Sequence, residues 1–371
     1  MDPFRTKRPV YILLAVCLVL TAVSLSLIYW VSNNLQAATR LSATGLASDG
    51  AGYSLMADEA GETYVLGDYT TRVGFDGITL MSARGDERAH YETDMLGPYV
   101  LQDNDTLVVG SAEGSDVFVL NQDGSYFRPA ITGAVSSAVC QDGRLLVIAA
   151  RPGGRTMLTE TELATNEMSE LYSFPAGLEP MRARYTPQAN TIDVLVQPVY
   201  AGETGTKLIR LTKAGEIVSE QRAPADDWFA DFIYVSDGRM AVLGASSVWL
   251  TDMMSDAAGK RFDLPGAAGL WQADSRLIAL AESEGDKYAL YELTDAAAPL
   301  VQLETRPLIM PAVSDTYAVV VTGDTLQLID IRGARQIDAF PLTQTVHRVE
   351  FTGPTSFIVI ADYGVYPFAV Q

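Results

Sequence analysis

Apolar residues recur in short runs along most of this chain, from residue 51 to residue 371. The runs span about four to seven residues, and turn-forming residues such as Gly, Asp, Asn and Pro separate one run from the next. No amphipathic stretch of helical period in this region reaches about 12 residues. The pattern predicts an all-β domain over residues 51–371.

Two series of turns repeat along the domain with the same period. The first is a tight turn between two strands, from residues 83–86 to residues 331–334. The second is a turn before an apolar strand, from residues 103–105 to residues 353–354. In both series the turns recur about every 41 residues, and the two series interleave. Each repeating unit is therefore expected to hold four short strands.

Four strands in about 41 residues are typical of one blade of a β-propeller, whose radial arrangement leaves few sheet edges open. The length of the domain favours eight blades, and seven remain the alternative because the first unit, residues 63–82, is irregular. The last unit supplies only three strands before the chain ends at Gln371. We expect its fourth strand to come from the N-terminal side, near residues 53–56, which would close the ring.

The N-terminal region has a different pattern. No charged residue lies between Arg8 and Arg40, and residues 10–31 form an almost unbroken apolar run. These 22 residues would span about 33 Å as a helix, enough to cross a hydrocarbon core of about 30 Å. The sequence predicts a tail over residues 1–9, one transmembrane helix over residues 10–32 and a small, polar linker over residues 33–50.

The tail predicts the orientation of this helix. Arg5, Lys7 and Arg8 outnumber Asp2, so the positive-inside rule places the N-terminus in the cytoplasm and the β-domain outside the cell membrane. A cleaved signal peptide is the alternative, although its apolar region would typically span only about 7 to 15 residues. A lipoprotein anchor at Cys17 fits poorly because no small residue precedes this cysteine directly.

Charge and composition narrow the function classes. The chain has 26 Lys and Arg residues against 46 Asp and Glu residues, for a net charge of -20, which opposes nucleic-acid binding. Because the N-terminal tail is basic, the acidity belongs to the exterior domain. The spacing of Cys17, His90, Cys140 and His347 has no metal-ligand pattern, so we expect no metal site and no cofactor.

The chain resembles a known group of proteins over nearly its whole length, and two runs of the β-domain carry the resemblance. The runs are GITLMSARGDERAHYE and LGPYVLQDNDTLVVGSAEGSDVFVLNQDG. They resemble a family of bacterial single-pass membrane proteins that carry an extracytoplasmic β-propeller and have no assigned function. The repeats are also similar to those of WD-repeat and quinoprotein propellers. Trp228, Trp249 and Trp271 do not occupy a fixed repeat position, however, so a bound quinone cofactor is not expected.

Candidate chemistry is sparse. No Gly-x-Ser-x-Gly motif occurs, and no catalytic residue is assigned. Two acidic sets could pair carboxylates for glycoside hydrolysis or hold calcium, although charged loop tips explain them equally well. They are Asp226, Asp227 and Asp231, and Glu282, Glu284 and Asp286.

Aromatic residues alternate beside Asp226 and Asp227 and would suit a peptide or sugar on a propeller face, although core packing against the neighbouring blade is the favoured alternative. This cluster consists of Trp228, Phe229, Phe232 and Tyr234. The candidate residues for ligand or partner binding are Asp226, Asp227, Trp228 and Asp231.

Three functions are consistent with these features. The favoured hypothesis is a non-enzymatic binding or scaffold module, tethered to the membrane through residues 10–32 and presenting loops to a protein, peptide or glycan of the cell envelope. An envelope hydrolase or lyase would use carboxylates near the axis of the propeller. A sensor of extracytoplasmic ligands is the third hypothesis, and its short cytoplasmic tail would have to recruit a partner through the membrane.

Overall fold

The architecture comes from a computed structural model of the whole chain. It describes residues 46–48 and 52–370 and the single positions Thr21, Ser24 and Ser26. Within the longer range the gaps are residues 57–58, 83, 94, 96, 104–105, 112–116, 132, 152, 189, 200–204, 225, 236–237, 256–258 and 286. The predicted tail and most of the predicted transmembrane helix and linker therefore lie outside the described residues.

Seven blades are four-stranded antiparallel sheets built from consecutive strands. Blades 1 and 2 contain β3 (Thr63–Leu66), β4 (Tyr69–Gly74), β5 (Gly77–Ser82), β6 (Glu87–Glu92), β7 (Pro98–Asp103), β8 (Thr106–Ser111), β9 (Val117–Asn121) and β10 (Tyr126–Phe127). Blades 3 and 4 contain β11 (Ala134–Gln141), β12 (Arg144–Arg151), β13 (Arg155–Glu162), β14 (Glu167–Ser173), β15 (Leu178–Tyr185), β16 (Thr191–Pro198), β17 (Lys207–Thr212) and β18 (Ile217–Arg222).

The second half of the ring continues in the same order. Blades 5 and 6 contain β19 (Phe229–Tyr234), β20 (Met240–Gly244), β21 (Ser247–Thr251), β22 (Lys260–Asp263), β23 (Gly269–Ala273), β24 (Arg276–Glu282), β25 (Tyr288–Leu293) and β26 (Ala297–Leu303). Blade 7 contains β27 (Ala312–Val313), β28 (Tyr317–Thr322), β29 (Thr325–Asp330) and β30 (Arg335–Pro341). A 3-10 helix, η1 (Ala60–Glu62), precedes blade 1.

Blade 8 closes the ring with strands from both ends of the described chain. Its C-terminal strands are β31 (Val346–Phe351), β32 (Ser356–Ala361) and β33 (Gly364–Val370). The outer position is taken by β1 (Leu46–Ser48), whose Leu46 pairs with Val370, while β2 (Tyr53–Ser54) pairs with the start of β33. Closure from the N-terminal side is therefore confirmed. The prediction near residues 53–56 located β2 but missed β1, which lies within the segment assigned to the linker.

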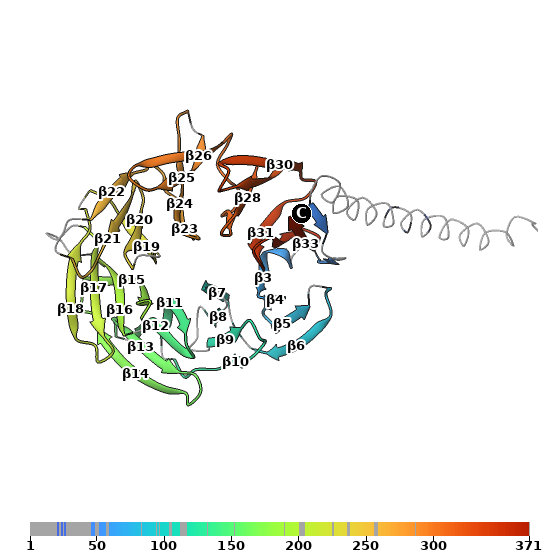
Figure 1. Cartoon of the computed structure of the whole chain (residues 1–371). Coiled ribbons are helices and arrows are strands. Elements are labelled where there is room, and N and C mark those ends of the chain that lie inside the picture. Colours follow the sequence, from blue (N-terminus) through green and yellow to red (C-terminus); the bar gives the residue numbers. More distant parts are fainter. Residues whose placement is uncertain are drawn as a thin grey trace, which may run out of the picture.

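The blades surround a common axis (Figure 1), with the first strand of each blade innermost and the fourth strand outermost. The middle strands carry nearly continuous apolar runs, such as the fully buried strand β8. The outer strands alternate exposed and half-buried side chains, as in β18. This difference arises because neighbouring blades cover both faces of the middle strands, whereas the outermost strands border solvent.

The hydrophobic core is divided among the contacts between neighbouring blades. Eight clusters of buried side chains occur, one at each of the eight blade-to-blade contacts. The cluster that joins blades 8 and 1 includes Leu55, Val65, Ile360 and Val365. These contacts confirm the all-β class and settle the blade number at eight rather than seven.

The antiparallel order gives the ring two different faces. The turns between first and second strands and between third and fourth strands share one face, which we call the turn face. The turns between second and third strands and the connections between blades share the other, which we call the loop face. Both predicted series of turns lie on the turn face, for example at Asp142 and Gly143, whose positive φ angles of 50° and 73° allow a two-residue hairpin.

The membrane prediction concerns residues that are almost entirely absent from the described set. Among the residues that the structure does describe, no helix is long and apolar enough to cross a membrane.

Candidate functional site

Asp227 holds two loops of the loop face together. Its carboxylate is 6% exposed and accepts hydrogen bonds from the Trp228 amide at 2.8 Å, the Ser246 amide at 3.1 Å and the Ser247 hydroxyl at 2.6 Å. These bonds join the connection between blades 4 and 5 to the turn between β20 and β21. Gly244 lies so close that a Cβ atom there would sit 2.5 Å from the Asp227 carboxylate. Asp227 therefore fixes the shape of this loop.

Asp226 and Trp228 flank Asp227 but point into solvent. The Asp226 carboxylate pairs with the Arg261 guanidinium, and this hydrogen bond holds the pKa of Asp226 below its usual value. The Trp228 side chain is 67% exposed. The neighbouring carboxylates Asp226 and Asp227 thus have separate partners. Trp228 is the exposed aromatic residue of the predicted set.

The aromatic side chains that follow Trp228 belong to the core. Phe229 and Phe232 are 2% and 0% exposed and pack with Leu195, Leu208 and Trp249 between blades 4 and 5. The core alternative from the sequence is therefore confirmed for these two residues and wrong for Trp228, whose side chain is exposed because it lies on a loop outside the strands. Phe229 and Phe232 are not available to line a binding surface.

Asp231 lies apart from Asp227, on innermost strand β19. The Arg182 guanidinium from blade 4 donates two hydrogen bonds to the Asp231 carboxylate, at 2.9 and 3.1 Å. The Arg184 guanidinium lies 3.8 Å from the same carboxylate. Two arginines of one blade thus converge on a single carboxylate of the next blade.

A second polar cluster joins strands β16 and β17 of blade 4 to strand β19 of blade 5. The fully buried Asp193 carboxylate binds Arg210 through two contacts of 2.7 Å and accepts a hydrogen bond from the Tyr234 hydroxyl at 2.7 Å. Burial and the Asp193 charge raise the pKa of Tyr234, so this hydroxyl stays protonated and acts as a donor. The sequence analysis missed the cluster because Asp193 and Tyr234 lie 41 residues apart within ordinary strand patterns.

Three blades meet at Glu350 on innermost strand β31. The Gln102 side-chain amide of blade 2 donates to Glu350 at 2.6 Å and to the Val65 carbonyl of blade 1 at 3.1 Å. Arg348 lies 3.6 Å from the Glu350 carboxylate and stacks over the Tyr64 ring at 4.1 Å. Desolvation by the surrounding side chains raises the pKa of Glu350. No sequence motif marks this group, since its members come from three distant repeats.

The remaining candidates have local roles. Glu282 accepts a hydrogen bond from the Tyr288 hydroxyl at 3.1 Å, and Asp286 lies outside the described residues. His347 pairs with Asp362 at 2.7 Å, and His90 contacts the Thr79 hydroxyl at 3.0 Å. Across the described part of the chain, no three His, Cys, Asp or Glu side chains are grouped so that they could hold a metal ion.

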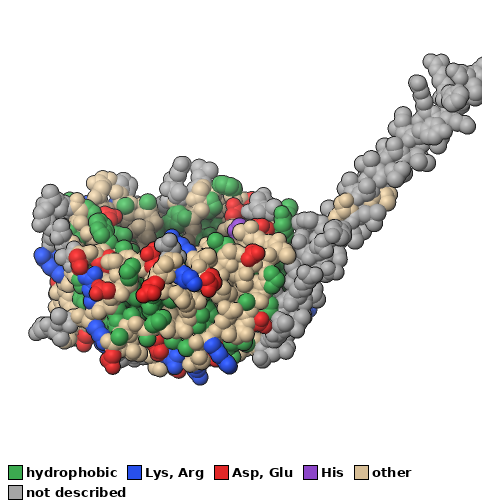
Figure 2. Space-filling model, turned by 90° about the horizontal axis from the view of Figure 1, so that it is seen from above, with side chains coloured by type: hydrophobic (Ala, Val, Ile, Leu, Met, Phe, Trp, Pro, Cys, Tyr) green, Lys and Arg blue, Asp and Glu red, His purple; other side chains and the backbone are tan. Residues whose placement is uncertain are grey.

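Exposed apolar side chains distinguish the two faces of the ring. Most large exposed ones outside the strands belong to the loop face, namely Met56, Phe75, Val199, Trp228, Leu308 and Met310, with exposures of 52% to 67%. Among the described residues, Met254 is the single counterpart on the turn face. The edge-on view in Figure 2 shows hydrophobic side chains at the upper rim of the disc, beside some charged ones, and several charged side chains along its lower rim. Except for Trp228, the sequence analysis missed these residues because each is isolated in a loop.

Comparisons with known proteins identify similar folds and no family. No protein-family model and no curated protein matches the chain. The computationally designed protein Ika8 is similar over 83% of this chain and 95% of its own, with a TM-score of 0.60 and 12% identity. The dihydro-heme d1 dehydrogenase NirN in complex with DHE matches over 81% of this chain and 68% of its own, with a TM-score of 0.54 and 16% identity.

A streptogramin B lyase gives a third structural match. It covers 76% of this chain and 96% of its own, with a TM-score of 0.51 and 13% identity. At such low identities these likenesses show the propeller fold alone. They include two enzymes, so they leave both enzymatic and non-enzymatic functions open.

Proposed function

We propose that this chain is a membrane-tethered binding protein whose propeller presents its loop face to a protein, peptide or glycan of the bacterial cell envelope. The proposal rests on the unequal distribution of exposed apolar side chains between the loop face and the turn face. Six of them lie on the loop face, against Met254 on the turn face among the described residues. Exposed apolar side chains concentrated on one side of a soluble domain are typical of interaction sites.

Trp228 is the best anchor for such a partner. Its ring is 67% exposed, yet its backbone is fixed on both sides, because its amide donates to Asp227 and its carbonyl accepts from the Ala245 amide at 2.9 Å. A large aromatic side chain on a rigid loop loses little conformational entropy when a partner covers it. Ring closure by eight blade contacts keeps the other loops at fixed positions around it.

The position of β1 supports the tethered arrangement. Leu46 pairs with Val370, at the end of β33 that adjoins the turn face. Strand β1 therefore begins at the turn face, and the loop face lies on the opposite side. Release of the full chain from membranes by detergent but not by alkaline carbonate would support the tether, whereas carbonate release would oppose it.

A specific observation favours a second candidate, an enzymatic role near the axis. The raised pKa of Glu350 suits a general acid, and Arg348 beside it could bind an anionic group. Glu350→Gln would abolish any hydrolase or lyase activity found in the purified protein if this candidate is correct. Unchanged activity in that variant would remove Glu350 as the acid.

The binding proposal is tested with the tagged full chain purified from its native membranes. Trp228→Ser and Leu308→Ser are expected to reduce recovery of a specific envelope partner by at least about tenfold, the loss that follows removal of an interface anchor. Met254→Ser is the matched control on the turn face and is expected to leave recovery unchanged. Equal recovery with all three variants would contradict the proposal.

A further inference from the structure

A hollow of about 320 Å³ opens on the loop face between blades 3 and 4. One side is formed by the turn between β12 and β13 at Gly154 and Arg155, and the other by the start of β15 at Glu179. The connection over residues 174–177 lies between them. None of the residues proposed above as partner anchors lines this hollow, so it is a separate feature of the same face.

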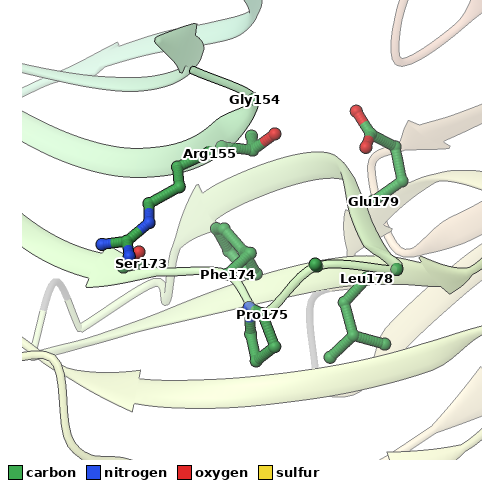
Figure 3. A pocket seen from close by; sticks show the side chains of 10 residues that line it. Gly154, Arg155, Ser173, Phe174, Pro175, Leu178 and Glu179 are labelled. Carbon is green, nitrogen blue, oxygen red and sulfur yellow. The ribbon is translucent and has the colours of Figure 1, made fainter. Parts of the chain in front are cut away.

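Opposite charges lie on the two sides of the hollow, and three apolar residues lie between them (Figure 3). Phe174, Pro175 and Leu178 lie in the middle, Arg155 extends on one side above Ser173, and Glu179 extends on the other. Within the described part of the chain, neither Arg155 nor Glu179 has an ion-pair partner.

Arg151 lies in the same hairpin as Arg155 but, unlike Arg155, has an ion-pair partner among the described residues. It ends strand β12, pairs with Arg155 in the hairpin register, and its guanidinium lies 2.5 Å from the Glu170 carboxylate. Strand β14 thus neutralises one arginine of the hairpin through Glu170, and the other arginine faces the hollow.

We propose that this hollow binds a short peptide with apolar side chains and two free termini. Its carboxylate would lie at Arg155, its ammonium group at Glu179, and its side chains over Phe174, Pro175 and Leu178. A guanidinium is well suited to a carboxylate because it offers two parallel N–H donors. This site extends beyond the proposed function and does not depend on it.

The size of the hollow limits the ligand. Its volume of about 320 Å³ is at the lower end of small-molecule pockets, which span about 300 to 1,000 Å³. An extended peptide advances about 3.3 to 3.6 Å per residue, so the terminal charges of a dipeptide or tripeptide lie farther apart than those of a free amino acid. A free amino acid carries both charged groups on one Cα atom and cannot serve both sides equally well.

The test uses the full chain in lipid nanodiscs, titrated with leucyl-leucine by isothermal titration calorimetry. We expect saturable binding of one peptide per chain, weakened about tenfold or more by Arg155→Gln and by Glu179→Gln. Arg151→Gln, whose side chain pairs with Glu170 outside the hollow, is expected to bind as the unaltered chain does. All three changes affect exposed or half-buried side chains, and thermal melting verifies that the variants are folded.

Modified ligands show which charge meets which terminus. Acetylation of the peptide amine should weaken binding to the unaltered chain and have little further effect in Glu179→Gln. Amidation of the peptide carboxylate should weaken binding to the unaltered chain and have little further effect in Arg155→Gln. Free leucine should bind at least about tenfold more weakly than the dipeptide, since it lacks the separation of charges.

Three results would overturn the site. The first is the absence of saturable leucyl-leucine binding. The second is an affinity of Arg155→Gln and Glu179→Gln for the dipeptide equal to that of the unaltered chain. The third is an affinity of the unaltered chain for free leucine equal to its affinity for the dipeptide. The loss of partner recovery in Trp228→Ser is measured independently, so failure of one proposal leaves the other distinguishable.

Discussion

The Gln102 side-chain amide donates a hydrogen bond of 2.6 Å to the Glu350 carboxylate, joining blade 2 to blade 8 across the inner edge of blade 1. The two residues lie 248 positions apart in the chain. Because the same amide also donates to Val65 of blade 1, one side chain ties together the three blades on either side of ring closure. Glu350 therefore reports on the integrity of the closed ring.

The raised pKa of Glu350 predicts a pH dependence of stability. The folded state binds this proton more tightly than the unfolded state, so the contribution of Glu350 is most favourable below its unfolded pKa and is lost as pH rises through the higher folded value. The free energy of unfolding of the unaltered chain, relative to Glu350→Gln, should fall across this window and level off above it. Chemical denaturation of both proteins at a series of pH values measures the difference.

The lowered pKa of Asp226 predicts a pH dependence of stability in the opposite direction. Its pKa is lowered by Arg261, so its stabilising contribution is present above the unfolded pKa and is lost as pH falls through the folded value. Relative to Asp226→Asn, the unaltered chain should therefore gain stability with rising pH. The same trend in the Glu350→Gln comparison would contradict the direction assigned to Glu350.

The contact between Asp231 and Arg182 predicts a measurable coupling between blades 4 and 5. Asp231→Asn leaves two arginines facing each other without their carboxylate and should lower the free energy of unfolding by about 1–3 kcal/mol. A double-mutant cycle with Arg182→Met should give a coupling of about 1 kcal/mol. Additive effects of the two substitutions would show that this pair does not hold the blades together.

Asp227 is expected to act on stability and loop shape rather than on chemistry. Asp227→Ala removes the acceptor for three donors at the loop face and should cost about 2–3 kcal/mol in the free energy of unfolding. Gly244→Ala should also destabilise the loop because its Cβ would collide with the same carboxylate. Thermal unfolding with circular dichroism tests both variants. A fully stable Asp227→Ala protein would contradict the structural role.

Strand β1 predicts where the chain can be shortened. A protein that starts at residue 41 retains β1 and should match the stability of the propeller in the full chain. A protein that starts at residue 52 leaves the edge of β33 open, which should cost at least about 2 kcal/mol and promote association through that edge. Light scattering and thermal melting compare the two. Equal behaviour would show that residues 46–48 are dispensable for closure.

The regular part of the architecture could be predicted from the sequence because it depends on local patterns. Turns such as Asp142-Gly143 recur where a tight hairpin requires unusual backbone angles, and the apolar strands that follow them must be buried on both faces. Both predicted series of turns belong to the turn face. The repeat therefore revealed the blades and their approximate number.

The candidate site could not be predicted to the same extent because its residues follow no period. Asp226, Asp227, Trp228 and Asp231 are close in sequence, yet Asp227 binds Ser246 and Ser247 while Asp231 binds Arg182 of the preceding blade. Contacts between repeats, such as Gln102 with Glu350, depend on ring closure and leave no local signal. Isolated apolar residues such as Leu308 are significant only once the topology places their loops on one face.

Site-specific photo-crosslinking in intact cells tests the binding role of the loop face most directly. A photoreactive amino acid would replace Phe75, Trp228 or Leu308 on the loop face and, in matched controls, Asp142, Met254 or Arg332 on the turn face. If the loop face binds the partner, we expect a shared crosslinked partner for the three loop-face positions and none for the turn-face positions. Crosslinks to one partner from the turn face alone, or equally from both faces, would contradict it.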